Sequence, residues 1–316
     1  MLGVSAAATL AGCATAEVNP LPTAPGAYAA PQGQAWAPNA QAGWLPAFGT
    51  PGMTALVEEA LSANPGLIAA QARAEAAQAR AEGVGGRRWP SLDLSFGGAR
   101  TETPVAGTTL TTDALSLGAT ASWEVDVWGR VGAVADAASL DAAASTLDAQ
   151  GAALSVTGQT ARAFVDLLAA QERLALAQED LATRERALAI TERRYEQGIL
   201  TALALRTARS QTASARAGEA AAQDSLAVSA RRLQLLLGRY PDGALRIADR
   251  MPALSALDAA GAPEALLRQR PDVLASLARL EAAGFRLEEA RAALLPRLTL
   301  TARADANGSQ LADLID

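Results

Sequence analysis

The sequence predicts a mainly α-helical protein with a small β part, in which long antiparallel helical hairpins are joined to β-hairpins. Three observations predict this class. Apolar residues recur every seven positions through a run of more than a hundred residues that ends at Pro241. Two segments of 32 residues match without a gap, which indicates internal repeats. Alternating apolar and polar residues follow the first of these segments, as in β-strands.

The composition narrows the classes of function. The 316 residues include 50% hydrophobic side chains, many of them alanine, and only 4% aromatic ones, which suits helices packed closely together. A net charge of −6 leaves no broad basic surface for nucleic acid. The chain has no histidine and one cysteine, which removes most metal sites and most nucleophilic triads. We therefore expect neither enzymatic activity nor a cofactor.

The start of the chain has the features of an exported lipoprotein. Residues 1–12 are apolar and small, too short to span a bilayer, and read as a signal peptide whose true start lies upstream of Met1. The sequence Leu-Ala-Gly-Cys ending at Cys13 resembles a bacterial lipobox, which implies that Cys13 carries the lipid anchor. The rest of 13–50 is rich in small residues and proline and predicts an extended strap.

An internal repeat organises the rest of the chain. Residues 64–95 align with 270–301 at a constant offset of 206. Two prolines 25 residues apart occur in both copies, which shared alanine-rich composition does not explain. The matching pairs include Pro65 with Pro271, Arg73 with Arg279, Arg80 with Arg286 and Pro90 with Pro296.

Each copy predicts a helix followed by a strand. The first proline suits the first turn of a helix, and the helix stops before the second proline. In the first copy a strand is expected over 91–100, then a turn over 101–109, then a second strand. Two such strands match the length of a transmembrane β-hairpin. A soluble hairpin packed on helices is the alternative, and the hairpin alone would favour it.

Two long helices come next. The seven-residue repeat predicts one helix over 131–197, which at about 1.5 Å per residue is roughly 100 Å long. Gly198 supplies a turn, and a second helix is expected over 201–237. An antiparallel hairpin of this length protrudes from its own domain or assembles with other copies.

Several motifs together resemble the outer-membrane efflux protein family, of the TolC and OprM type. "SWEVDVWGR" (122–130) and "RYEQGILTALAL" (194–205) are similar to two of its signatures, and 266–283 and 290–302 are similar to the opening of its second repeat. The closest resemblance is to lipoprotein outer-membrane subunits of resistance-nodulation-division efflux systems. It implies a homotrimer in which β-hairpins close a transmembrane β-barrel and helices close a periplasmic α-barrel.

The resemblance and the residue types assign roles to the strand-to-helix junction. Trp123 and Trp128 suit a membrane interface. Glu124 and Asp126 are expected on one face of a strand, directed at a water-filled lumen or at an arginine of a neighbouring protomer, with Arg130 as one candidate. Gly129 allows the change of direction between strand and helix.

The resemblance also implies the partners. A periplasmic adaptor would dock on the helical tip at Tyr195, Gly198, Ile199 and Thr201, and an inner-membrane pump would supply the substrate. Ala204 replaces the acidic residue that usually completes the capping box at this tip. The expected function is a passive outer-membrane duct for small molecules and drugs, lipid-anchored, with a periplasmic helical extension.

The domain division follows from these assignments. We expect a first structural repeat over 51–240, a linker over 241–262 and an incomplete second repeat over 263–316. The sequence is then either a fragment of a longer protein, which we favour, or a decayed copy of its gene. Three other functions compete with a drug duct: a type I secretion duct, a periplasmic coiled-coil adaptor, and a structural lipoprotein. A glycosidase built on Glu124 and Asp126 is disfavoured, because a long heptad hairpin offers no sugar cleft.

Overall fold

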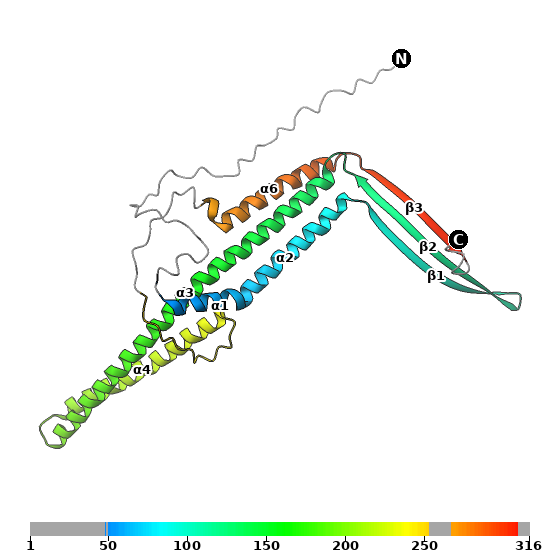
Figure 1. Ribbon diagram of the computed structural model, residues 1–316. Helices are drawn as coiled ribbons and strands as arrows, with labels where there is room; N and C mark the ends of the chain where they lie inside the picture. The colour runs from blue at the N-terminus through cyan, green and yellow to red at the C-terminus, as the bar shows by residue number, and fades with distance from the viewer. Residues whose placement is uncertain (1–47, 49, 253–266, 309–316) are drawn as a thin grey trace, which may run out of the picture.

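A computed structural model describes residues 48, 50–252 and 267–308. In it a bundle of long helices meets a three-stranded antiparallel sheet at one end, and the molecule is elongated (Figure 1). Cys13, the predicted signal peptide, nearly all of the predicted strap and part of the predicted linker lie outside the described residues. The elements, in chain order, are α1 (Pro51–Ala63), α2 (Pro65–Gly85), η2 (Gly86–Arg88), β1 (Ser91–Val105), β2 (Thr108–Val125), α3 (Arg130–Glu196), α4 (Ala202–Leu236), α6 (Pro271–Ala292) and β3 (Leu298–Gly308).

The long helical hairpin is confirmed to within one residue at each helix end. α3 has 67 residues and α4 has 35. Gly198 ends α3 with a φ of 74°, while the N–H of Ile199 donates to the carbonyl of Arg194 at 2.9 Å. Thr201 then caps α4, because its hydroxyl accepts from the N–H of Ala204 at 3.3 Å. The turn between the helices is therefore a Schellman motif followed directly by an N-cap.

α3 is the central element of the helical part. Its N-terminal half is flanked by α2 on one side and α6 on the other, and its C-terminal half pairs with α4 (Figure 1). The main core lies near the middle of α3, where α1 and α4 meet it. Its largest fully buried side chains include Phe164, Leu167, Leu233, Met53 and Val57.

The two helix-then-strand segments fold as the sequence predicts. Pro65 and Pro271 occupy the first turns of α2 and α6, and Pro90 and Pro296 separate these helices from β1 and β3. Asn64 caps α2 through its side-chain oxygen and donates its amide to the carbonyl of Leu236, at the end of α4. Both copies of the matching sequence therefore enter the sheet in the same way.

The predicted loop at 101–109 is wrong. β1 continues to Val105 and β2 begins at Thr108, so that only Ala106 and Gly107 turn, with φ of 47° and 86°. Positive φ at both positions gives the two-residue turn whose twist matches that of the strands. Threonines on both sides of the turn favour strand over loop, so Thr101 pairs with Thr112 and Thr103 with Leu110.

Among the described helices, none is both long enough and apolar enough to span a membrane.

Candidate functional site: the strand-to-helix junction

An ion pair joins the end of β2 to the start of α3. Arg130 donates from Nη2 to Glu124 Oε2 at 2.7 Å and from Nε to Oε1 at 2.9 Å, and both side chains are about three-quarters buried. The hydrogen bonds that Arg130 donates to the Glu124 carboxylate raise the pKa of the Arg130 guanidinium above its ordinary value. Glu289 of α6 lies 3.8 Å from the same guanidinium. Arg130 therefore connects β2, α3 and α6. The predicted arginine partner of Glu124 is found, but it belongs to the same chain and not to a neighbouring protomer.

Asp126 does not share a strand face with Glu124, and this part of the prediction is wrong. β2 ends at Val125, and the Asp126 side chain accepts hydrogen bonds from the N–H groups of Val131 at 2.9 Å and Gly132 at 2.7 Å. These N–H groups belong to the first turn of α3 and have no partner within the helix. A carboxylate at this position also interacts favourably with the helix dipole. Gly129, with a φ of 73°, makes the turn that brings Asp126 back over the helix end.

The two tryptophans connect the junction to the two helix-then-strand segments. Trp123 donates its indole N–H to the carbonyl of Arg88 at 3.1 Å, between α2 and β1. Trp128 donates its indole N–H to the carbonyl of Pro296 at 2.8 Å, between α6 and β3. Each indole therefore satisfies a backbone carbonyl where a helix gives way to a strand.

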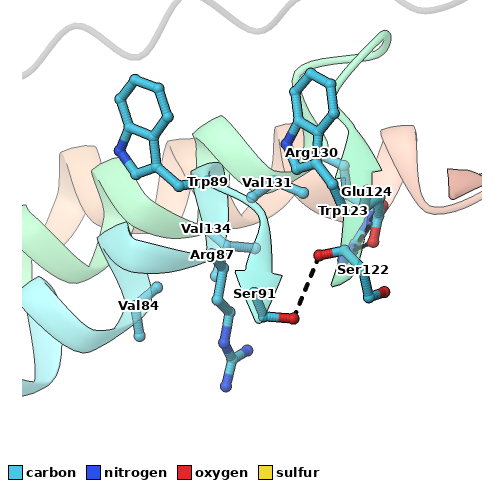
Figure 2. A pocket seen from close by; sticks show the side chains of 10 residues that line it. All are labelled: Val84, Arg87, Trp89, Ser91, Ser122, Trp123, Glu124, Arg130, Val131 and Val134. Carbon is cyan, nitrogen blue, oxygen red and sulfur yellow. Dashed lines mark hydrogen bonds and ion pairs between the residues drawn. The ribbon is translucent and has the colours of Figure 1, made fainter. Parts of the chain in front are cut away.

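A pocket of about 280 Å³ opens beside this junction (Figure 2). The indoles of Trp89 and Trp123 lie on one side of it and the side chain of Arg87 extends on the other. Trp89 is 75% exposed. Sequence reasoning missed Trp89, although an aromatic residue directly before Pro90 could have indicated it. The remaining lining residues are Val84, Ser91, Ser122, Glu124, Arg130, Val131 and Val134.

The sheet beyond the junction has one apolar and one polar face. Strand register places Leu94 beside Ala119 and Ala304, while Asp93 lies beside Thr120 and Arg303 on the opposite face. The apolar side chains are exposed: Leu92 by 67%, Leu94 by 74% and Phe96 by 65%. This arrangement exposes an apolar surface that no other described element covers.

The predicted tip residues lie at the far end of the molecule from the sheet, in the turn between α3 and α4 (Figure 1). Ile199 is 66% exposed and Tyr195 is 40% exposed, whereas Gly198 and Thr201 build the turn. Leu203 was not among the predicted tip residues, and it is 75% exposed beside them. The tip and the junction are thus two separate sites at opposite ends of α3.

Within the described residues, no cluster of three or more His, Cys, Asp or Glu could hold a metal ion. The charged groups of the junction pair with one another or cap a helix. These contacts fix the geometry between β2, α3 and α6.

Comparison with known proteins identifies the family to which this fold and junction belong. The sequence profile of the outer membrane efflux protein family matches residues 56–239. The chain belongs to that family. It is 31% identical over 281 residues to the pyoverdine export outer membrane protein OpmQ of Pseudomonas aeruginosa, covering 85% of this chain and 59% of OpmQ. It therefore spans about three-fifths of that relative's length.

A shorter match and two solved structures agree. Over 121 residues, 38% of this chain and 25% of the relative, it is 35% identical to the toluene efflux pump outer membrane protein TtgF of Pseudomonas putida. The structure of CusC matches with a TM-score of 0.73 and 29% identity, covering 93% of this chain and 69% of that one. The Campylobacter jejuni CmeC outer membrane channel matches with a TM-score of 0.78 and 23% identity, covering 92% and 63%, and this likeness shows the fold alone.

Proposed function

We propose that this chain contributes to a protomer of a trimeric outer-membrane duct, through which small molecules leave the cell passively. The observation that carries the proposal is the two-faced sheet mounted on a helix of roughly 100 Å. Such a molecule places an apolar surface at one end and a long water-exposed hairpin at the other. Family membership and the relatives' roles in export support the same function.

The apolar face of the sheet matches the thickness of an outer membrane. It extends along β2 from Val125 to Leu115, about 34 Å at 3.4 Å per residue. Strands tilted by about 40° would give a band roughly 25 Å tall, the height of the apolar band in outer-membrane barrels. The next row on this face holds the ion pair of Arg100 with Asp113, at 2.7 Å, which ends the band. The band is Leu92, Leu94, Phe96, Gly98, Leu115, Leu117, Ala119, Ala121, Trp123, Val125, Leu298, Leu300, Ala302, Ala304, Ala306 and Gly308.

The opposite face suits a water-filled lumen. Over the same rows it carries serine, threonine, glycine and one asparagine, together with four charged side chains, Asp93, Glu124, Arg303 and Asp305. The outer edges of β1 and β3 have no neighbouring strand in the described part of the chain. Pairing between protomers would remove both edges and close the sheet into a barrel, as an apolar environment requires.

The other predicted features complete the proposal. Cys13 would anchor the mature chain by lipid, and Trp123 and Trp128 would lie near the membrane boundary, where Glu124, Asp126, Gly129 and Arg130 fix the change from strand to helix. An adaptor would dock at Tyr195, Gly198, Ile199 and Thr201, and an inner-membrane pump would deliver the substrate. The first repeat would occupy 51–240, the linker 241–262 and the second repeat 263–316.

Efflux complementation tests the proposed function. The gene would be removed from its source organism and restored on a plasmid, and accumulation of a fluorescent efflux substrate would be measured in both strains. Restoration should lower accumulation, and the protein should fractionate with the outer membrane. Unchanged accumulation together with a soluble periplasmic protein would contradict the proposal. Restored secretion of a polypeptide instead would identify a type I secretion duct.

A further inference from the structure

We propose that the pocket beside the junction binds one membrane phospholipid, with the lipid phosphate at Arg87 and an acyl chain against the indoles of Trp89 and Trp123. The inference rests on the proposed position of the sheet in the outer membrane, and it adds a lipid site where the sheet joins the helices. Three features of the pocket support it: its two unlike sides, its polar groups without partners, and their absence from the second copy of the repeat.

The pocket has an apolar side and a polar side. In Figure 2 the indoles of Trp89 and Trp123 extend to one side, and the side chain of Arg87 extends to the other. Trp123 belongs to the apolar face of the sheet, in register with Leu300, so the indole side continues into the apolar band. Ser122 lies on the opposite, polar face. A ligand with an apolar chain and a charged headgroup matches this division.

Arg87 is the uncompensated charge of the pocket. Its side chain is exposed and has neither an ion pair nor a hydrogen bond among the described residues. The neighbouring Arg88, by contrast, pairs with Asp136 at 2.5 Å. Arg130 also lines the pocket, but Glu124 neutralises it. A free guanidinium binds phosphate oxygens through two parallel hydrogen bonds, so an anionic headgroup suits this end of the pocket.

Trp89 is the exposed aromatic group of the pocket. It is 75% exposed, and its indole N–H has no acceptor in the part of the chain that the structure describes. The indole N–H groups of Trp123 and Trp128 both bind backbone carbonyls. An indole with an apolar ring and a free N–H is typical of a membrane interface, where the N–H meets polar lipid groups.

The second copy of the repeat lacks the polar part of this site. At the offset of 206 residues, Arg87 corresponds to Ala293 and Trp89 to Leu295. Leu295 is 43% exposed, so the second segment keeps an apolar side chain before its proline. A general apolar contact with the membrane needs no more than that leucine. The guanidinium and the indole N–H of the first segment therefore indicate a ligand with a polar head.

A free inorganic phosphate is the rival occupant. It would use Arg87 and leave the apolar wall of the pocket without a partner. That wall includes the indole of Trp89, the half-buried Val84 and Val134, and the buried Val131. A phospholipid covers the wall and neutralises the guanidinium at the same time. The occupant is therefore assigned to the membrane, and the free ion becomes an outcome of the test.

Lipid titration followed by native mass spectrometry tests the inference. The full chain would be extracted in detergent from the membranes of its source cells, delipidated, and titrated with phosphatidylglycerol. The wild type should bind one lipid per chain and prefer it to diacylglycerol with the same acyl chains. Arg87→Gln should raise the concentration at half-saturation about fivefold. Trp89→Ala should weaken binding as well, and circular dichroism should show unchanged helix content in both variants.

Two matched variants make the result specific. Arg73→Gln removes another exposed arginine of α2, and Leu294→Ala removes a side chain that is 86% exposed beside β3. Both should bind the lipid as wild type does; an equal loss in either would indicate an unspecific lipid coat and overturn the inference. Unchanged binding by Arg87→Gln would overturn it too, as would displacement of the lipid by excess inorganic phosphate. A wild-type protein that complements efflux and binds no lipid would overturn this inference alone, whereas failed complementation would contradict the proposed function.

Discussion

Trp128 donates its indole N–H to the carbonyl oxygen of Pro296 at 2.8 Å, although 168 residues separate the two in sequence. This bond joins the junction between β2 and α3 to the point where α6 gives way to β3. Trp123 makes the corresponding bond to Arg88 on the other side, at 3.1 Å. The junction is therefore held from both neighbouring segments.

Trp128→Phe should loosen the second segment locally. It removes the hydrogen bond and keeps most of the ring, which is 52% exposed, so the expected loss is about 1 kcal/mol. Hydrogen exchange measured by mass spectrometry should be faster around 296–301 and unchanged around 86–92. Trp123→Phe is the matched variant and should reverse this pattern. The same regional response in both variants would contradict the assignment.

Asp126→Ala should destabilise the start of α3. Two helix N–H groups lose a charged acceptor, and the expected cost in free energy of unfolding is about 1–2 kcal/mol. Asp126→Asn keeps one side-chain acceptor and should cost less. Chemical denaturation of the two variants beside wild type measures the difference. Equal stability of wild type and Asp126→Ala would show that the cap contributes nothing.

Arg130→Lys should fail to replace arginine in the junction. Lysine keeps the positive charge, but it cannot donate to both oxygens of Glu124 in the fork geometry that the structure shows. We expect a loss of about 1–2 kcal/mol for this partly buried pair. A double-mutant cycle with Glu124→Gln isolates the pairwise free energy. A coupling free energy near zero would rule out a stabilising role for the pair.

Ala119→Arg should reduce the amount of protein in the outer membrane. Ala119 lies near the middle of the apolar band, where an arginine facing lipid costs about 2–4 kcal/mol. Thr120→Arg is the neighbouring control, because its side chain lies on the polar face. Immunoblots of outer-membrane fractions compare the two. Equal loss in both variants would contradict the assignment of the faces.

Low pH should weaken the end of α4. Hydrogen bonds from the Gln234 side chain, at 2.6 Å, and from the N–H of Ala244 lower the pKa of Asp242. Because the folded-state pKa lies below the unfolded one, this stabilisation is present above about pH 4 and is lost as the pH falls through the folded value. Hydrogen exchange around 234–244 should accelerate in acid. Asp242→Asn should remove that acceleration. If the variant accelerates in acid as much as wild type does, Asp242 is not the group responsible.

Much of the helical fold was predictable because its signals are local and periodic. The seven-residue repeat, Gly198 and Pro65 define α3, its turn and the start of α2 within one residue. The β-hairpin turn was misplaced, because threonine, glycine and proline together resemble a loop, whereas pairing across the strands extends β1 to Val105.

The junction was predictable in its residues and only partly in its contacts. An arginine of a neighbouring protomer, with Arg130 as a candidate, was the expected partner; Arg130 does bind Glu124, but within one chain. The capping role of Asp126 depends on the chain folding back at Gly129, and the spacing of apolar residues in the sequence does not predict that reversal. The bond between Trp128 and Pro296 depends on a segment 168 residues away. Contacts of this kind come from the assembled fold and not from local sequence.

Lipid accessibility of the two sheet faces tests the central claim most directly. Single cysteines would replace Leu94 and Ser95 and carry a fluorescent label. The parent protein, treated with the same label, would show how much of the signal comes from Cys13. Quenching would then be measured in outer-membrane vesicles with brominated lipid and with a water-soluble quencher. A membrane-spanning duct predicts lipid quenching at position 94 and aqueous quenching at position 95. Aqueous quenching at both positions, without lipid quenching, would mean that the sheet lies outside the membrane.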